Sequence, residues 1–224
     1  IGSIRGGDYY QTAPFDTIYN AGKLNTIAAY IQDEHAFFDN KIRLNAGLRF
    51  DQVSFLDGEF TSTDPWTVEP EMKNHTWSEI SPRAGVRFNF VDYLSAYISY
   101  SHGFRASIVD DLTRTGWMWV GPKYANPELQ PESLDTYEIG FDVFPIRDLK
   151  ISSSAYMMYG EDFLYYVATS DSIFGRPIYR RENVTNVEIM GFEFEFLYNI
   201  TKNLTLMGGY TYADSRISQF AEMP

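Results

Sequence analysis

Runs of strict two-residue alternation, joined by connections that are alternately short and long, limit what this chain can fold into. The even positions of residues 42–50 carry only apolar side chains, and the odd positions carry only Arg, Asn or Gly. Residues 192–196 alternate Phe with Glu in the same way. Because successive side chains of a strand point to opposite faces of a sheet, this pattern predicts strands with one apolar and one polar face.

The same alternation predicts eight antiparallel strands, most of them 12 residues or longer. They cover residues 23–38, 41–55, 76–90, 93–105, 133–145, 149–162, 183–199 and 203–216. Strands of globular proteins usually have ~5–6 residues, whereas a tilted strand needs ~9–11 residues to cross a membrane. The predicted lengths therefore favour membrane-crossing strands.

Two kinds of connection alternate between these strands. Tight turns are predicted at Asp39-Asn40, Val91-Asp92, Pro145–Asp148 and Ile200–Lys202. Polar, irregular loops are predicted at about 56–75, 106–132 and 163–182, and the acidic tract 57–71 is expected to be solvated and mobile. Strict alternation places every tight turn at one end of the sheet, which is typical of an outer-membrane barrel. We therefore expect an all-β fold, a transmembrane antiparallel β-barrel segment with short periplasmic turns and long extracellular loops.

Composition excludes several other classes of protein. The chain of 224 residues carries 30 Asp and Glu against 18 Lys and Arg, a net charge of −12, so we expect no nucleic-acid partner. It contains no cysteine, which excludes disulfides, thiolate nucleophiles and cysteine-ligated metals. No uncharged run reaches the ~18 residues that a transmembrane helix needs. The longest such run, Tyr93–Phe104, has 12 residues.

Four short phrases follow one another along the predicted strands. They are Ser81-Pro82-Arg83-Ala84-Gly85, the run Tyr97–Ala106, the run Asn126–Glu132 that leads into Tyr137–Gly140, and Asn183-Val184 ahead of Gly191–Glu195. In this order the phrases resemble the barrel of a TonB-dependent outer-membrane receptor, over about residues 24–215. One departure is Ser107, where the family usually has Pro, so we expect a less rigid entry into the loop.

The resemblance implies an energised importer rather than an enzyme. A receptor of this family closes about 22 strands around a plug, so residues 1–224 are expected to be a partial barrel without the plug and the terminal closing strand. The implied partners are the rest of the barrel and the plug, the TonB complex of the inner membrane, the lipid of a Gram-negative outer membrane and a small-molecule ligand. No cofactor and no catalytic residue is expected, because the barrel carries out no covalent chemistry.

Two groups of aromatic and basic residues in the predicted loops are candidates for ligand binding. They are Trp117, Trp119 and Tyr124 with Arg105 before them, and Tyr165, Tyr166 and Tyr179 with Arg176, Arg180 and Arg181. Flat rings stack on a bulky ligand, and guanidinium groups bind anionic oxygens. The alternative is an interfacial girdle and ordinary loop packing, since Tyr and Trp gather at membrane interfaces in any case.

The ligand expected from the resemblance is a metal chelate of the ferric siderophore kind. Members of the family that take up haem carry a His between the boxes at 103–106 and 126–129, whereas residues 107–125 of this chain contain none. Imidazole is the usual neutral nitrogen ligand of such an iron. Cobalamin, haem bound by other residues, and glycans remain alternatives, since ring stacking serves them too.

Two other interpretations stay open. One is a passive or structural eight-stranded barrel; the other is a secreted hydrolase, favoured only by Glu193, Glu195 and four Asn-x-Ser/Thr sequons. For the two glutamates we instead expect a charge ladder on the lumenal face. Its partners would be arginines such as Arg43, Arg49, Arg83 and Arg87. Asp110 and Asp111 are expected to be a solvated loop pair, and the three histidines are too scattered for a metal site.

Overall fold

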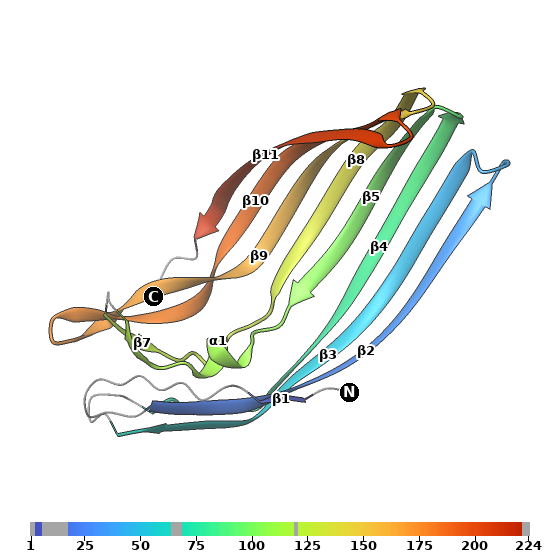
Figure 1. Ribbon diagram of the computed structural model, residues 1–224. Helices are drawn as coiled ribbons and strands as arrows, with labels where there is room; N and C mark the ends of the chain where they lie inside the picture. Colours follow the sequence, from blue (N-terminus) through green and yellow to red (C-terminus); the bar gives the residue numbers. More distant parts are fainter. Residues whose placement is uncertain (1–2, 6–17, 64–68, 119–120, 221–224) are drawn as a thin grey trace.

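Eight long strands form one continuous sheet that curls into a trough (Figure 1). The computed structural model describes residues 3–5, 18–63, 69–118 and 121–220. The long strands are β2 (Ile18–Phe37), β3 (Ile42–Ser62), β4 (His75–Val91), β5 (Leu94–Arg105), β8 (Glu132–Ile146), β9 (Leu149–Ile173), β10 (Arg176–Thr201) and β11 (Leu204–Phe220). Each pairs antiparallel with the next long strand along the chain, which confirms the eight strands expected from the sequence.

Four shorter elements lie at one end of the trough. They are β1 (Ser3–Arg5), α1 (Val109–Thr113), β6 (Gly116–Met118) and β7 (Gly121–Tyr124). β6 and β7 form a small hairpin, and β7 also pairs in parallel with β10, Lys123 with Tyr179 and Tyr124 with Arg180. Within the described ranges, no helix is long and apolar enough to cross a membrane.

Tight turns join the strands at one end of the trough, and the long connections lie at the other (Figure 1). β2 turns into β3 through Phe38, Asp39 and Asn40, whose φ angles are 53°, 55° and 67°. Asp and Asn enter this left-handed region more readily than most other side chains. The other tight turns lie at residues 92–93, 147–148 and 202–203. The four predicted tight turns and their common position at one end of the sheet are therefore confirmed.

Cross-strand register divides the side chains between the two faces of the sheet, because residues directly opposite one another point to the same face. One row of opposed residues runs Leu44, Val86, Ile98, Ile139, Ala155, Phe192 and Tyr212. The neighbouring row runs Arg43, Arg87, Tyr97, Gly140, Ser154, Glu193 and Thr211. The apolar and polar rows continue across the seven strands from β3 to β11, as the alternation predicts.

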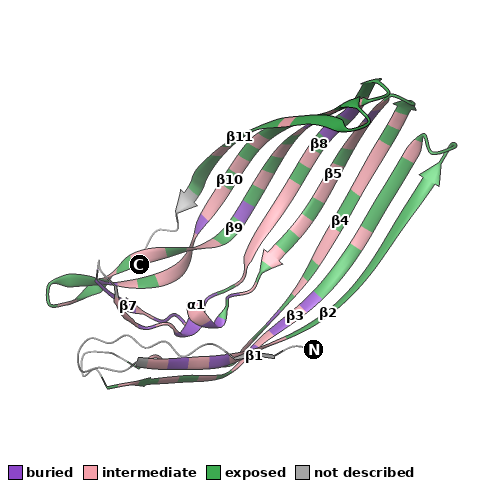
Figure 2. Cartoon of the chain, viewed as in Figure 1, coloured by how far each residue is buried: buried purple, intermediate pink, exposed green. Residues whose placement is uncertain are grey.

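The connection between β5 and β8, residues 106–131, folds back into the trough (Figure 1), and we call it the strap. It forms the buried core together with the sheet. The core residues are Val53, Phe55, Trp77, Val109, Leu112 and Leu129. Figure 2 shows burial concentrated around α1 and β7, whereas β2 and β11 are largely exposed. Because Phe55 shares its face of β3 with Arg43 and packs against α1 inside the trough, the polar row lies on the concave face.

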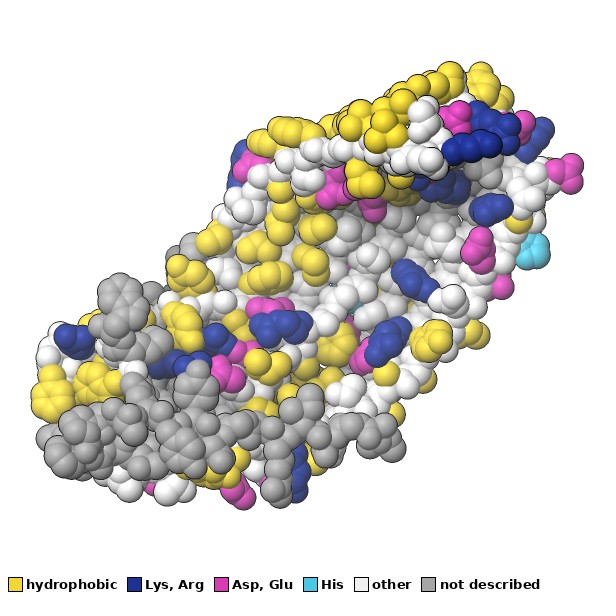
Figure 3. All heavy atoms as spheres, in the orientation of Figure 1, with side chains coloured by type: hydrophobic (Ala, Val, Ile, Leu, Met, Phe, Trp, Pro, Cys, Tyr) yellow, Lys and Arg dark blue, Asp and Glu magenta, His cyan; other side chains and the backbone are white. Residues whose placement is uncertain are grey.

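The space-filling view looks into this concave face (Figure 3). Charged side chains of both signs lie in the hollow, and hydrophobic side chains gather along the edge over β11. Near the tight turns, a hollow of about 680 Å³ is lined by charged residues that include Arg43, Arg87, Asp142 and Lys150. The concave face is thus suited to water and polar partners, and the convex face is suited to an apolar surrounding.

Glycines on one strand make room for aromatic rings from the next strand on the concave face. A Cβ atom at Gly191 would lie 2.2 Å from Cζ of Tyr156, and one at Gly140 would lie 2.6 Å from Cζ of Tyr97. Each glycine is directly opposite its tyrosine in the register. The tyrosine side chains can therefore lie across the sheet, which a larger residue at either glycine would prevent.

The connection at residues 163–182 is an extended hairpin, so the expectation of an irregular loop is wrong for nearly its whole length; in the connection at 56–75 it is wrong for residues 56–62 and for His75. β3 continues to Ser62, and β9 and β10 continue until they meet at Phe174 and Gly175, whose φ angles of 51° and 72° form a tight turn. We call the outer part of this hairpin, residues 163–182, the arm. In the acidic tract, residues 57–62 are strand; residues 64–68 lie outside the described residues, so the expected mobility stays a prediction.

A bulge marks the point at which each of these two extensions begins. Asp57 has φ 51° and Asp162 has φ 58°, and the strand register shifts opposite both. Bulges increase the twist of a strand and break its side-chain alternation. The two-residue period therefore ends near residues 55 and 162, where the sequence analysis ended the strands although the pairing continues.

Candidate ligand-binding site

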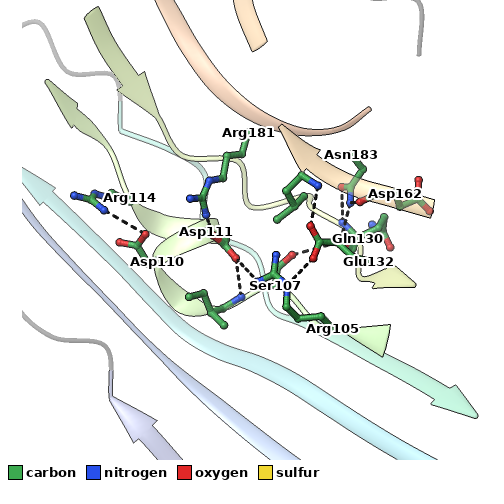
Figure 4. Close-up of polar contacts among 12 residues, drawn as sticks. Arg105, Ser107, Asp110, Asp111, Arg114, Gln130, Glu132, Asp162, Arg181 and Asn183 are labelled. Atoms are coloured by element: carbon green, nitrogen blue, oxygen red, sulfur yellow. Dashed lines mark hydrogen bonds and ion pairs between the residues drawn. The ribbon is translucent and has the colours of Figure 1, made fainter. Parts of the chain in front are cut away.

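The strap and the arm meet at a buried carboxylate, that of Asp111 on α1 (Figure 4). The residue is 1% exposed. Its Oδ2 accepts hydrogen bonds from Nη1 of Arg105 at 3.3 Å and from the backbone N–H of Ile108 at 3.3 Å, and its Oδ1 forms an ion pair with Nη1 of Arg181. The expectation of a solvated loop pair is therefore wrong for Asp111, because the arm and the end of β5 both supply a guanidinium to it.

Two further carboxylates complete this ionic junction. Oε2 of Glu132 accepts a hydrogen bond from Nε of Arg105 at 2.5 Å, and its Oε1 accepts one from the backbone N–H of Leu164 at 2.8 Å. Oδ2 of Asp110 accepts a hydrogen bond from Nη1 of Arg114 at 3.4 Å. Arg105, a candidate for ligand binding, therefore also has a structural role, because its guanidinium binds the carboxylates of both Asp111 and Glu132.

Two asparagines join the strap to the arm through backbone groups, and Figure 4 shows one of them, Asn183. Nδ2 of Asn183 donates to the carbonyl oxygens of Gln130 at 2.9 Å and Asp162 at 2.7 Å, and its Oδ1 accepts from the backbone N–H of Gln130 at 2.9 Å. Nδ2 of Asn126 donates to the carbonyl oxygen of Arg181 at 2.8 Å. Both asparagines begin one of the phrases that carry the family resemblance, so these phrases mark the closure of the strap on the arm.

Replacing Asn183 by Ala is expected to loosen the strap by about 1–2 kcal/mol, because Gln130 loses partners for both its backbone groups. Hydrogen exchange of the strap amides in the intact receptor should quicken roughly tenfold. Asn199→Ala is the matched control, since among the described residues the Asn199 side chain accepts only from the Thr205 hydroxyl, beside a tight turn. Equal exchange rates in the two variants would contradict this role of Asn183.

Tyr166 of the arm lies close to two cations at the same junction. Nζ of Lys123 lies 5.2 Å from the ring centroid, and Cζ of Arg181 lies 4.9 Å from it. Burial lowers the pKa of Lys123 to about 8; the Asp110 carboxylate opposes this shift, and the Arg114 guanidinium adds to it. Burial also lowers the pKa of Arg181 and raises that of Tyr166. Positive charge is therefore concentrated where little water reaches it.

The structure brings part of the first aromatic group together. The ring of Trp117 stacks on that of Phe174 at the tip of the arm, with centroids 6.2 Å apart. Tyr124 lies on β7, directly beside Arg180 in the parallel register. Trp119 lies outside the described residues, so its position stays a prediction.

The second candidate group is divided between the two faces of the arm. Tyr166 is opposite Arg181 and Tyr165 is opposite Glu182, and consecutive residues of a strand point to opposite faces. Tyr166 faces the strap, whereas Tyr165 is 54% exposed, and Arg180 forms an ion pair with Glu182. The exposed members of the group are Tyr165, Arg176 and Arg180. These residues therefore do not form one continuous cluster.

The two glutamates of β10 lie on the concave face as expected, but their expected ion pairs with arginine are wrong. Directly opposite them across the sheet are Ser154, Thr211, Ser152 and Gly209. Arg87 instead binds Asp142, with Nη1 2.7 Å from Oδ2. In the part of the chain that the structure describes, neither glutamate forms an ion pair. The arginines lie on strands too far across the trough to reach them.

Several residues of the junction were not candidates from the sequence. They are Asp111, Gln130, Glu132 and Asn183. Their types are common in loops, and only the positions of Gln130, Glu132 and Asn183 within the phrases of the family resemblance could have pointed to them. Ser107, which replaces the expected Pro, is 1% exposed and its Oγ donates to the carbonyl oxygen of Gln130 at 3.4 Å. Across the described residues, no three His, Asp or Glu side chains gather as ligands of a metal ion.

The fold defines the chain as a wall segment of a β-barrel receptor. Its antiparallel sheet is curled, its four predicted tight turns lie at one end of the sheet, and the strap folds into the trough. Residues 2–222 match the family model of the TonB-dependent receptor-like β-barrel. The chain belongs to this family, whose members are transport receptors rather than enzymes.

Relatives and solved structures agree with this membership. The ferrioxamine receptor of Yersinia enterocolitica is 26% identical over 216 residues, which are 94% of this chain and 26% of that receptor. The ferric-catecholate import receptor Fiu of E. coli K12 has a TM-score of 0.66 at 17% identity, over 91% of this chain and 29% of its own. The Serratia marcescens hemophore receptor HasR, in complex with its hemophore and heme, has a TM-score of 0.64 at 15% identity, over 89% and 42%. The chain spans about a quarter of the length of its curated relative.

Proposed function

We propose that this chain is part of an outer-membrane receptor that captures a ferric siderophore and imports it into the periplasm with energy supplied through TonB. The similarity to a ferrioxamine receptor along 94% of the chain carries this proposal. A ferric-catecholate import receptor and the ferric preacinetobactin receptor of Acinetobacter baumannii share its fold. We thus assign a ferric siderophore to the intact receptor as the class of ligand that these relatives are named for.

In this proposal the convex face of the sheet contacts lipid. The apolar row through Ile98, Ile139 and Phe192 supports this placement, since lipid-facing and lumen-facing residues alternate along barrel strands. The tight turns then lie in the periplasm, and the strap and arm lie at the extracellular mouth. A ligand that arrives from outside would meet the aromatic and basic residues of the strap and arm first.

The rest of the receptor has to complete the wall. Unpaired backbone groups are very unfavourable in hydrocarbon, and the outer edges of β2 and β11 offer such groups over most of their length. We therefore assign to the full-length protein the remaining barrel strands and a plug in the trough, and to the inner membrane a TonB complex that moves the plug. The wall itself carries out no covalent chemistry.

A chelate that shows rings and anionic oxygens fits the residues at the mouth better than haem does. Trp117, Tyr124 and Tyr166 supply rings, and Arg105 and Arg180 supply guanidinium groups. Residues 107–125 contain no imidazole to approach an iron. Haem, cobalamin and glycans are the competing ligands. Their binding to the receptor has to be compared directly with that of a ferric siderophore.

Binding of ferric siderophores, haem, cobalamin and oligosaccharides to the intact receptor in micelles tests the proposal. Quenching of tryptophan fluorescence reports each ligand, and at least one ferric siderophore should bind ~100-fold more tightly than the other classes, a difference of about 2.7 kcal/mol. Tyr124→Phe serves as the haem control. Residues 107–125 contain no His, and Tyr124 is the one tyrosine among them that could bind the iron instead. Tight haem binding that survives this change, or a preference for cobalamin or sugar, would overturn the choice of ligand.

A further inference from the structure

Lys123 is a buried cation to which no described residue offers a hydrogen-bond acceptor. Its side chain is 1% exposed, and Nζ has no hydrogen-bond partner within the described ranges. The ring of Tyr166, 5.2 Å away, attracts the charge but provides no lone pair of the strength of an oxygen. Pairing of β7 with Gly116 on one side and Tyr179 on the other fixes the lysine backbone in this place.

The carboxylates around the junction are already engaged by other cations. Asp111 is shared by two guanidinium groups. Glu132 binds Arg105 with Oε2 2.5 Å from Nε, and Asp110 binds Arg114 with Oδ2 3.4 Å from Nη1. At the junction, four cations (Arg105, Arg114, Lys123 and Arg181) therefore face three carboxylates (Asp110, Asp111 and Glu132). An anion from outside these residues would balance the charge.

Physical chemistry defines what this partner must be. A buried ammonium group is unfavourable unless it is paired and hydrogen-bonded. Nζ carries three donors, and the Arg181 guanidinium lies 4.9 Å from the centroid of the same ring. A carboxylate or phosphate oxygen satisfies both requirements, because it accepts hydrogen bonds and carries the opposite charge.

We propose that Lys123 and Arg181, which lie 5.2 Å and 4.9 Å from the centre of the Tyr166 ring, form a site for a single oxyanion, a carboxylate or phosphate group, and that filling this site stabilises the strap against the arm. Nζ exposes less than 1 Å², so an anion reaches it only when the lysine side chain moves. The four-carbon stem of the lysine rotates freely enough to meet such a group at the edge of the strap. The inference rests on the proposed function only where it assigns the oxyanion to the imported chelate.

The site predicts a particular dependence on pH. Asp110, Arg114, Tyr166 and Arg181 are the charged and titratable groups that face the ammonium from the strap and the arm. With no anion bound, the pKa of Lys123 is about 8, below its ordinary value of 10.5. The open strap then binds more protons than the closed strap between these values, so closure becomes more favourable as pH rises through this window. A bound oxyanion keeps the lysine charged, raises its pKa and removes this dependence.

Nuclear magnetic resonance of the intact receptor, with lysine isotope-labelled at its ε-carbon, measures the titration directly. The signal lost in Lys123→Met identifies the residue. We expect a midpoint near 8 in anion-free buffer and an upward shift of about one unit or more when sodium phosphate is added. A midpoint near the ordinary 10.5 without anion, or no response to any oxyanion, overturns the site.

Two chelates identify the source of the oxyanion. Ferric citrate presents free carboxylates, whereas ferrioxamine B presents none, so the assignment to an imported chelate requires the first and not the second to shift the Lys123 signal. A response to phosphate without a response to ferric citrate supports the site and overturns its assignment to a chelate. If the receptor binds no ferric chelate at all, the proposed function fails, while the phosphate titration still decides the site.

Charge-preserving and charge-removing variants separate the site from general effects on folding. Phosphate should slow hydrogen exchange of the strap amides in the unmodified receptor and in Lys123→Arg, but not in Lys123→Met. Lys202→Met is the matched control, because Lys202 is exposed in a tight turn at the far end of the trough, and it should respond like the unmodified receptor. Equal responses in Lys123→Met and Lys202→Met would contradict the proposal, whether or not either variant changes assembly.

Discussion

Phe194→Arg is expected to destabilise the assembled receptor by ~2–4 kcal/mol, the cost of a cation on the lipid face near the bilayer midplane. Phe194 lies in the apolar-facing set of β10, opposite Ser153 on β9 and Tyr210 on β11, and its ring lies 6.5 Å from that of Phe196. Both neighbouring strands hold the backbone, so the arginine has no route to the concave face. Urea unfolding of the intact receptor in lipid bilayers, followed by its heat-modifiable migration, measures the loss.

Glu193, the residue before Phe194, provides the control, because its side chain lies on the opposite face of the sheet. Its side chain points into the trough, opposite Ser154 and Thr211, and forms no ion pair in the described parts of the chain. Glu193→Ala should therefore change the unfolding free energy by less than about 0.5 kcal/mol, and Glu193→Arg should also assemble. If Phe194→Arg and Glu193→Arg were tolerated equally, the assignment of the convex face to lipid would be wrong.

Arg181→Met is expected to free the strap from the arm. Asp111 is 1% exposed and would keep only Arg105 and one backbone N–H as partners. Removing one partner of a buried ion pair costs about 3–5 kcal/mol, and we expect the lower end because Arg105 remains. A loss of about 3 kcal/mol corresponds to a roughly 100-fold faster exchange of strap amides in the intact receptor.

Arg180→Met is the matched control for this change. The two arginines are adjacent on β10, but Arg180 points away from the strap and pairs with Glu182 on the surface of the arm. An exposed pair of this kind contributes at most about 1 kcal/mol, so the strap should exchange nearly as in the unmodified receptor. Comparable acceleration in both variants would show that the arm as a whole, and not the buried ion pair, holds the strap.

The strands of the wall were predictable because one physical requirement governs every residue in them. Each side chain in the wall parts of β3, β4, β5, β8 and β10 faces either the apolar or the polar side, so a period of two survives within each of these strands. The tight turns were found for a related reason. Residues such as Asp39 and Asn40 tolerate the positive φ angles that a short connection needs.

The arm and the strap were not predictable in the same way. Beyond Asp162 the hairpin has the strap on one face and is open on the other, so apolar residues are no longer confined to alternate positions. The junction at Asp111 depends on contacts between residues about 50 to 70 positions apart, such as Arg181 and Asn183 with the strap. No local pattern encodes such pairs, and the sequence indicated Asp111 only as a member of a solvated loop pair.

Uptake of radioactive iron by cells is the most direct test of the central claim, that this chain belongs to an energised importer of ferric siderophores. Cells that produce the intact receptor should accumulate iron from a ferric siderophore that it binds. Accumulation should fall to the background of receptor-free cells when TonB is deleted or the inner-membrane proton gradient is collapsed. Uptake that continues without TonB and without the gradient, as expected of a passive barrel, would contradict the claim.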